Sequence, residues 1–202
     1  SAPTPAAIPE FFKMAGGGND FLIFDNRTGA IREAENLALA ICTRRLSVGG
    51  DGIILIENSP RATFRMRYLN ADGSLAEFCG NGTRCAARFA YVNVIAPKRM
   101  TIETGAGIIG AEVIDQNVGL TLQPPASVEL DRPLRLGDGR TIRGSYLRVG
   151  VPHYVVFLRE KLWEQQIEPL GREVRFHPDL APEGANVNFV VVRNRSLIEV
   201  RT

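Results

Sequence analysis

The strongest candidate for chemistry is Cys79, which is followed by Gly80, Asn81 and Gly82 and then by an alanine-rich segment. That segment, Thr83 to Val92, has no glycine or proline, so it is predicted to be a helix with Asn81 as its N-cap. A cysteine just before a helix meets backbone N–H groups that lack intrahelical partners, and these favour the thiolate. The glycines let amides approach a bound group closely. The pattern indicates an ionisable sulfur beside an anion-binding cluster.

A purely structural role for Cys79 stays open, because cysteine is among the most often buried residues. The other two cysteines are expected to be structural. Cys42 lies in a predicted amphipathic helix over residues 32–45, next to its apolar face. Cys85 is expected to pack with Phe89 and Val92, which follow it at helical spacing.

Metal and phosphate chemistry have little support in the sequence. His153 and His177 each lie beside a proline and far from any cysteine, without ligand spacing. The separation of Cys79 from Cys85 fits neither a zinc site nor a redox dithiol. The glycine-rich stretches match neither a P-loop nor a dinucleotide-binding fingerprint. No metal and no cofactor are therefore expected.

Composition narrows the class of protein. The 202 residues are 45% hydrophobic and 23% charged with a net charge of +2, so neither nucleic acid nor membrane is an expected partner. Three cysteines argue against a disulfide scaffold and for a cytoplasmic protein. Residues 1–10 are expected to form a flexible tail. The sequence leaves the oligomeric state open, with a homodimer as one option.

The supporting elements follow from apolar runs and glycine or proline breaks. Pro124-Pro125 is predicted as a boundary, giving one lobe over residues 11–124 and a second over 125–202. In the second lobe, a helix is predicted to be interrupted at Pro169 to Gly171, and a hairpin turn is expected at Asn194-Arg195. The expected strands are residues 11–14, 21–25, 53–57, 64–69, 100–103, 108–114, 118–122, 141–149, 154–158, 186–192 and 197–201, and the expected helices are 32–45, 83–92 (or on to 94 or 95) and 162–176.

Several short motifs, each weak alone, occur together in one order. They are Gly18-Asn19-Asp20-Phe21, Gly49-Gly50-Asp51-Gly52, Asn70-Ala71-Asp72-Gly73-Ser74, Cys79-Gly80-Asn81-Gly82-Thr83-Arg84-Cys85, Val151-Pro152-His153 and Ala185-Asn186-Val187-Asn188-Phe189. This ordered set closely resembles the diaminopimelate epimerase family, the cofactor-independent enzymes of lysine and peptidoglycan precursor synthesis. The resemblance covers the chain from Phe11 onward.

The resemblance implies an α+β fold of two similar lobes, each a mixed sheet curled around a central helix. It also implies a mechanism without pyridoxal phosphate, in which one cysteine thiolate removes the α-proton and a second cysteine returns a proton to the opposite face. Cys79 matches the cysteine of the first lobe, and Gly80 and Asn81 would hold the substrate carboxylate with main-chain and side-chain donors. The substrate-binding asparagines are matched by Asn19, Asn70 and Asn186.

Two departures qualify this resemblance. The family's second cysteine, in a Cys-Gly-(Thr/Ser)-Gly context, does not occur before Thr202, so the second lobe is expected to be incomplete and the 202-residue chain to lack turnover. Val151 stands where some family members have an asparagine, and valine cannot donate to a substrate. Three alternatives remain: a proline or hydroxyproline type of racemase, a binding module without activity, and a redox-active thiol.

Overall fold

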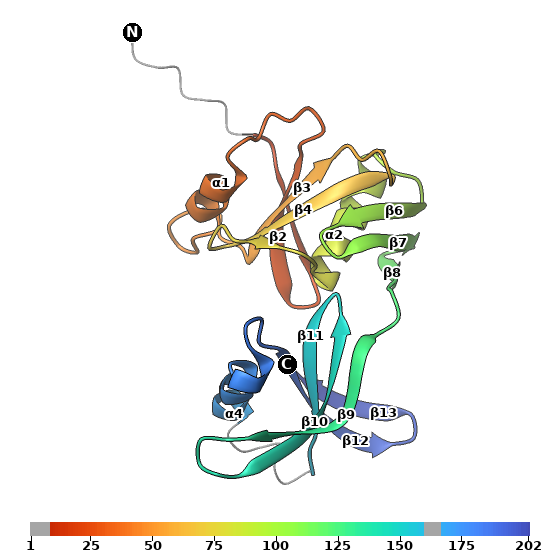
Figure 1. The fold of residues 1–202 in the computed structure, drawn as a ribbon. Coiled ribbons are helices and arrows are strands. Elements are labelled where there is room, and N and C mark those ends of the chain that lie inside the picture. Colours follow the sequence, from red (N-terminus) through yellow and green to blue (C-terminus); the bar gives the residue numbers. More distant parts are fainter. Residues whose placement is uncertain (1–8, 160–166) are drawn as a thin grey trace. The chain divides into compact units, whose positions relative to one another are not determined.

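The computed structural model describes residues 9–159 and 167–202, which fall into two compact units, Ser1–Leu122 and Gln123–Thr202 (Figure 1). The fold is α+β, with one mixed sheet and few helices in each unit, as the resemblance implied. In the described residues, no helix is both long and apolar enough to cross a membrane.

The sheet of unit 1 has the strand order β1-β2-β3-β4-β6-β7-β8, and the short β5 also pairs with β4. Strands β2 with β3 and β4 with β6 run parallel, whereas the other pairs are antiparallel. The strands are β1 (Phe12–Gly16), β2 (Asn19–Asp25), β3 (Gly52–Glu57), β4 (Phe64–Asn70), β5 (Leu75–Ala76), β6 (Arg99–Thr104), β7 (Gly107–Ile114) and β8 (Asn117–Thr121).

Strand β3 is the most deeply buried element of unit 1. Its residues from Gly52 to Ile56 are all buried. An uninterrupted apolar run of this kind is typical of a strand that is covered on both faces. Ile54 and Ile56 belong to the core on one face, and Ile53 and Leu55 belong to the core on the other. The alternation of side chains along a strand therefore divides unit 1 into two apolar layers.

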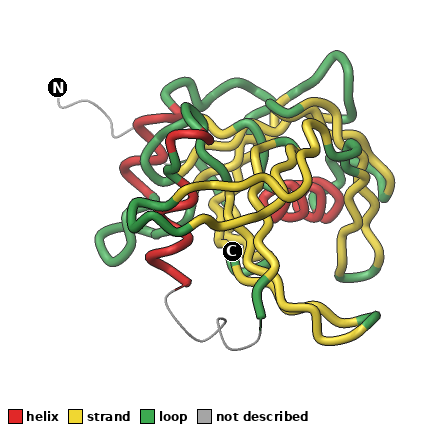
Figure 2. Tube along the Cα trace, turned by 60° about the horizontal axis from the view of Figure 1, so that its bottom comes forward, coloured by secondary structure: helices red, strands yellow, loops and turns green. Residues whose placement is uncertain are grey.

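Helix α2 (Gly80–Val92) fills the first of these layers. It contacts β1 and β2 and also β7 and β8, which lie at opposite ends of the strand order, so the sheet curls around it. Figure 2 shows this helix among the strands of the sheet. Cys85 and Phe89 face the core as predicted, but Val92 is 59% exposed, so its predicted packing is wrong. The helix does not extend to Val94, which has a φ of 57°.

Helix α1 (Ala34–Ile41) packs on the other face of the sheet. It is shorter than the predicted 32–45, because Cys42 already forms its C-cap and the chain turns at Arg45, whose φ is 71°. Ala34 and Ala38 are buried as expected for the apolar face. Cys42 is 2% exposed and lies in this core, which confirms its structural interpretation.

Unit 2 contains a five-stranded sheet of order β13-β12-β11-β10-β9. Only the β11–β12 pair is parallel. The strands predicted over residues 141–149 and 197–201 are confirmed as β10 and β13, and β12 begins as predicted but runs two residues further, to Asn194. Strand β11 begins three residues early, at Val151, and the β12–β13 turn lies at Arg195-Ser196, one residue later than expected. The strands are β9 (Ala126–Arg135), β10 (Thr141–Val149), β11 (Val151–Phe157), β12 (Asn186–Asn194) and β13 (Leu197–Arg201).

Strand β9 was not predicted. Its residues are mostly exposed, and Ser127 and Asp131 have positive φ values of 50° and 54°, so the alternating apolar pattern of a half-buried strand is missing. Its pairing with β10 also shifts register twice. An irregular edge strand of this kind leaves little trace in the sequence.

Helix α4 (Ile167–Arg175) covers the apolar core of unit 2, and the short η1 (Pro178–Leu180) follows it. The predicted interruption at Pro169 to Gly171 is wrong, since both ends of that tripeptide lie within α4. Pro169 is the third residue of the helix, where the missing N–H would have no intrahelical partner. Residues 162–166 of the predicted helix, and residues 1–8 of the predicted tail, lie outside the described residues.

Candidate functional site

Cys79 is itself the N-cap of α2, with extended φ and ψ values of −144° and 110°. The prediction that Asn81 caps this helix is wrong, because Gly80 and Asn81 already have helical conformation. The Cys79 carbonyl accepts hydrogen bonds from the backbone nitrogen and the hydroxyl of Thr83, both at 2.8 Å. The Cys79 sulfur accepts from the Gly82 nitrogen at 3.3 Å. The sulfur therefore takes the place that a serine or aspartate oxygen takes in an ordinary N-cap.

Two further amides lie at the same helix end. The backbone N–H groups of Gly80 and Asn81 have no hydrogen-bond partner among the described residues. They belong to the first turn of α2, where the helix dipole is positive. A carboxylate placed at this end of the helix would find free donors beside the sulfur of Cys79.

Of the three cysteines, all of them free, only Cys79 is partly exposed. Burial raises the pKa of Cys42 to about 11, and the nearby Asp20 carboxylate adds to this effect. Burial also raises the pKa of Cys85, to which the neighbouring Cys79 contributes. At neutral pH the two buried sulfurs are therefore held as thiols, which leaves Cys79 as the candidate nucleophile or base.

Asn19 and Asn81 are joined directly, although they are far apart in the sequence. The Asn81 side-chain nitrogen donates to the Asn19 side-chain oxygen at 2.9 Å and to the Gly17 carbonyl at 3.1 Å. Gly17 has a φ of 59°, and a Cβ there would collide with the Asn81 side chain. The glycine run of the β1–β2 hairpin thus allows the hairpin to approach the start of α2.

A cluster of charges supports this hairpin from the side opposite Asn81. Asp51 accepts from the Asn19 side chain at 2.9 Å, and Arg44 donates to both Asp51, at 2.9 Å, and Asp20. Lys13 lies 3.2 Å from Asp20. Chiefly because of the hydrogen bond from Arg44, and against the effect of burial, the pKa of Asp20 is lowered to about 2.

This charged cluster was missed as a unit by sequence reasoning. Asp51 directly follows Gly49-Gly50, Asp20 follows the first glycine run after one residue, Asn19, and Arg44 precedes the second run. The opposite charges of Arg44 and of the two aspartates, which border the two glycine-rich loops, would have been the signal that these loops meet. Nothing in the sequence specifies that both loops meet at Asn19.

Asn70 ends β4 at the same edge of the sheet as Asn19. Gly52 of β3 pairs with Asn70 on one side and with Phe21 on the other, so the three strands are in register there. The Asn70 side-chain nitrogen donates to the Ser74 hydroxyl at 3.0 Å, within the predicted turn. The structure therefore brings Asn19, Asn70, Cys79 and Asn81 to the same part of unit 1.

Asn186, the remaining site residue suggested by the sequence, belongs to unit 2. Its side-chain oxygen accepts from Arg175 at 2.7 Å, while its side-chain nitrogen has no partner in the described parts of the chain. It lines a cavity of about 560 Å³ together with residues of α4 and with Arg201 and Thr202. The amide of Asn186 is thus oriented with its donor available to a ligand.

The histidines have local roles in unit 2. Burial lowers the pKa of His153, and its Nδ1 lies 3.1 Å from the Asn188 side-chain nitrogen. His177 Nδ1 accepts from the Asp179 backbone at 3.2 Å and so caps η1. Within the described ranges, no group of three or more His, Cys, Asp or Glu residues could hold a metal ion.

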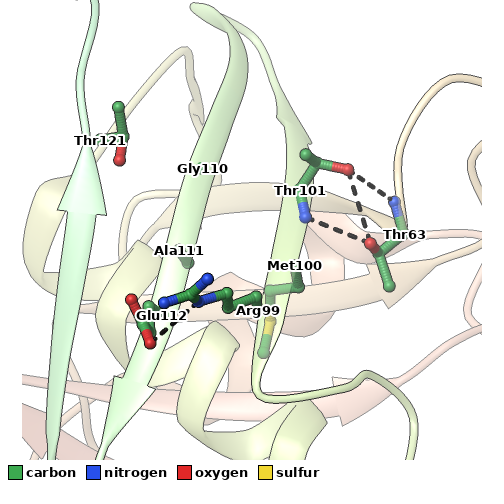
Figure 3. A pocket seen from close by; sticks show the side chains of 8 residues that line it. All are labelled: Thr63, Arg99, Met100, Thr101, Gly110, Ala111, Glu112 and Thr121. Atoms are coloured by element: carbon green, nitrogen blue, oxygen red, sulfur yellow. Dashed lines mark hydrogen bonds and ion pairs between the residues drawn. The ribbon is translucent and has the colours of Figure 1, made fainter.

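A hollow of about 360 Å³ in unit 1 contains none of the site residues suggested by the sequence (Figure 3). It lies over β6, β7 and β8. The Arg99 side chain pairs with Glu112 at 3.0 Å, and Thr63 and Thr101 bond to each other's backbone nitrogens. The two charged residues that line this hollow, Arg99 and Glu112, pair with each other, and no cysteine lines it, in contrast to the region around Cys79.

Solved structures of an epimerase and of a phenazine biosynthesis protein share this fold. A hydroxyproline epimerase from Agrobacterium vitis has a TM-score of 0.67 at 18% identity, covering 94% of this chain and 68% of that one. A Bacillus anthracis protein of the phenazine biosynthesis PhzF family has a TM-score of 0.66 at 16% identity, covering 95% of this chain and 69% of that one. At these identities the likeness shows the fold alone.

Sequence comparison is more specific. The profile of the family "Diaminopimelate epimerase" matches residues 11–125. The diaminopimelate epimerase of Hydrogenobaculum sp. (strain Y04AAS1) is 43% identical over 94% of this chain and 73% of its own length. That of Aquifex aeolicus (strain VF5) is 40% identical over 96% of this chain and 72% of its own length. The chain belongs to the diaminopimelate epimerase family.

Proposed function

We propose that this chain binds diaminopimelate and carries one half of the acid–base machinery that interconverts its LL and meso forms in lysine and peptidoglycan precursor biosynthesis. The observation that carries the proposal is the position of Cys79, whose sulfur lies at the start of α2 beside free backbone amides. Membership of the family supports the choice of substrate.

The chemistry of the first step follows from the helix end. An α-amino acid is a weak carbon acid, so removal of its α-proton requires stabilisation of the charge that develops on the carboxylate. The free N–H groups of Gly80 and Asn81 are placed to supply this. The Cys79 thiolate would take the α-proton and become a thiol, and the electron pair of the broken C–H bond would pass to the carboxylate. No pyridoxal phosphate is needed for this step.

Inversion requires a second acid on the opposite face of the α-carbon. Neither remaining cysteine can act as one, because Cys42 is 2% exposed and Cys85 is 4% exposed, each in an apolar core. Both sulfurs also lack access to a substrate held at the start of α2. We therefore expect the 202-residue polypeptide to bind diaminopimelate without epimerising it.

Each unit, taken by itself, carries polar groups that suit the substrate. Asn19 and Asn70 lie at one edge of the unit 1 sheet, and Asn186 offers a free amide donor in unit 2. Asparagine suits a substrate with two amino acid ends, since its amide can accept from an ammonium and donate to a carboxylate. Val151, half-buried in β11, offers no such group.

Calorimetric titration tests this assignment. The chain is expected to bind LL- and meso-diaminopimelate and to bind trans-4-hydroxy-L-proline at least about tenfold more weakly, because the latter lacks a second amino acid end. Tighter binding of trans-4-hydroxy-L-proline than of diaminopimelate would instead indicate an activity of the proline racemase type. Lack of binding to either ligand would overturn the proposal, and conversion of LL- to meso-diaminopimelate would overturn the expected lack of turnover.

A further inference from the structure

We propose that Asp51 is a positioning residue, which fixes the side-chain amide of Asn19 and, through Asn19, that of Asn81 at the start of α2. The inference deepens the proposed function, on which it rests for the identity of the ligand. Asp51 makes no hydrogen bond to Cys79 in the described residues, and its carboxylate is linked to the start of α2 through the two asparagines.

The first step of this relay is set by the chemistry of a carboxylate. Asp51 Oδ2 accepts from the Asn19 side-chain nitrogen at 2.9 Å and from the Asp20 backbone nitrogen at 3.1 Å. An ionised carboxylate can only accept hydrogen bonds, so Asn19 must turn its NH₂ group to Asp51. The Asn19 carbonyl oxygen is then directed to Asn81, and a flip of the amide would place two acceptors against each other.

The second step fixes Asn81. Its NH₂ group donates to the Asn19 oxygen at 2.9 Å and to the Gly17 carbonyl at 3.1 Å, and its own side-chain oxygen accepts from Arg84. The polar atoms of this side chain are therefore engaged within the protein. We infer that Asn81 serves a ligand through its backbone N–H, and that its side chain ties the start of α2 to the hairpin.

Asp51 is well held for this role. Arg44 donates to its other oxygen at 2.9 Å. The Asp51 backbone nitrogen donates to the Asp20 carbonyl at 2.8 Å, and the Ala71 nitrogen donates to the Asp51 carbonyl at 3.0 Å. The residue thus bridges the β2 strand, which carries Asn19, and the turn that follows Asn70. Asp51 is placed where the backbone is fixed from two sides.

The charge of Asp51 is also secured. Burial raises the pKa of Asp51, but hydrogen bonds from Asn19, the Asp20 backbone and Arg44 outweigh this effect and lower it. The group is therefore ionised at neutral pH and acts only as an acceptor. Charge-assisted hydrogen bonds of this kind are stronger than those between neutral groups.

The test compares Asp51→Ala with Asp20→Asn. Asp20 shares the ion pair with Arg44, but its carboxylate does not bond to Asn19, so Asp20→Asn changes the charge of the cluster and leaves the relay intact. One readout is the side-chain NH₂ signals of Asn19 and Asn81 in ¹⁵N-resolved NMR spectra. The other is the concentration of meso-diaminopimelate that halves the rate of Cys79 alkylation by iodoacetamide.

Asp51→Ala is expected to shift the NH₂ signals of Asn81, two hydrogen bonds away, and to raise the half-protecting concentration about tenfold. Asp20→Asn is expected to leave the Asn81 signals in place and to change that concentration less than about twofold. Unmoved Asn81 signals in folded Asp51→Ala, or equal effects of the two variants, would overturn the proposal. If Asp51→Ala does not fold, Asp51→Asn is compared with Asp20→Asn in the same way. Because the asparagine side chain retains one oxygen acceptor, a smaller shift of the Asn81 NH₂ signals is then expected.

The two proposals fail in different ways. Absence of protection by diaminopimelate in the unaltered chain would reject the ligand and hence the proposed function. The NMR comparison does not use the ligand, so it would still decide whether Asp51 orients Asn81. Conversely, protection in the unaltered chain that Asp51→Ala leaves unchanged would retain the ligand and reject the relay.

Discussion

The sulfur of Cys79 accepts a hydrogen bond at 3.3 Å from the backbone nitrogen of Gly82, which is the third residue of α2. The Cys79 sulfur therefore caps the helix and is also the atom that we propose takes the α-proton of the substrate. Gly82 is buried, and a Cβ there would lie 3.2 Å from the Ile54 side chain and 3.5 Å from the Cys79 Cβ. The close approach of helix and sheet therefore depends on a residue without a side chain.

The buried thiols give a first prediction. Because the pKa of Cys42 is raised to about 11, its thiolate is scarce at pH 7, and its alkylation rate is expected to increase with pH until about pH 11 while the protein stays folded. Cys85 is expected to behave similarly, since burial raises its pKa as well. Peptide mass spectrometry after timed iodoacetamide treatment of Cys79→Ser measures both rates. A plateau of Cys42 labelling near pH 8 would contradict the expectation.

Gly52 provides a prediction on packing. A Cβ at this position would lie 2.7 Å from the Tyr68 ring and would collide with the Leu69 carbonyl, which the sheet holds in place. Gly52→Ala is expected to cost about 3 kcal/mol of unfolding free energy, because the backbone of β4 must shift. Gly119→Ala is the matched control, since its Cβ would meet nothing closer than 3.9 Å. Urea unfolding of both variants measures the difference, and equal midpoints would contradict it.

Asp20 gives a prediction on pH. Its pKa in the folded state, about 2, lies below the ordinary 3.8, so its contribution to stability is present above pH 3.8 and is lost as the pH falls towards 2. Asp20→Asn is expected to lower stability by about 1 kcal/mol at pH 6, less than the full shift implies because Arg44 is largely in solvent. The difference should nearly vanish at pH 2. Thermal unfolding of both proteins at the two pH values tests this, and a constant difference would contradict it.

Arg175 allows a prediction for unit 2. Its guanidinium donates to the Asn186 side-chain oxygen at 2.7 Å, which leaves the Asn186 nitrogen free for a ligand. Arg175→Ala is expected to weaken diaminopimelate binding about threefold to tenfold, because the amide can then rotate. Arg172→Ala, on the same helix and without a bond to Asn186 in the described residues, is the control. Calorimetry that gives the same loss for both variants would reject an orienting role for Arg175.

Local sequence patterns predicted most elements of this protein, and the reasons for the exceptions are physical. Strand β3 and the core of α2 were predictable because an apolar run and an alanine-rich run each permit few structures. The start of α2 was misplaced because asparagine is the commoner cap, whereas here the sulfur of Cys79 takes that role. Strand β9 escaped prediction because it is exposed and irregular.

The candidate site was predictable only in part. Residue chemistry and family motifs pointed to Cys79 and the asparagines. They did not predict the direction of the hydrogen bonds among them, because Asp51 and Asn81 meet Asn19 only after three segments that are separate in the sequence come together. Such contacts between distant segments depend on the tertiary structure, which local propensity does not encode.

The central claim is that Cys79 acts on a diaminopimelate molecule held at the start of α2, and competitive alkylation at pH 7 tests it most directly. Iodoacetamide is expected to label Cys79 at least about tenfold faster than Cys42 or Cys85, and meso-diaminopimelate is expected to slow that labelling in a saturable manner. Equal, slow labelling of the three cysteines, or rapid labelling of Cys79 that diaminopimelate leaves unchanged, would contradict the account.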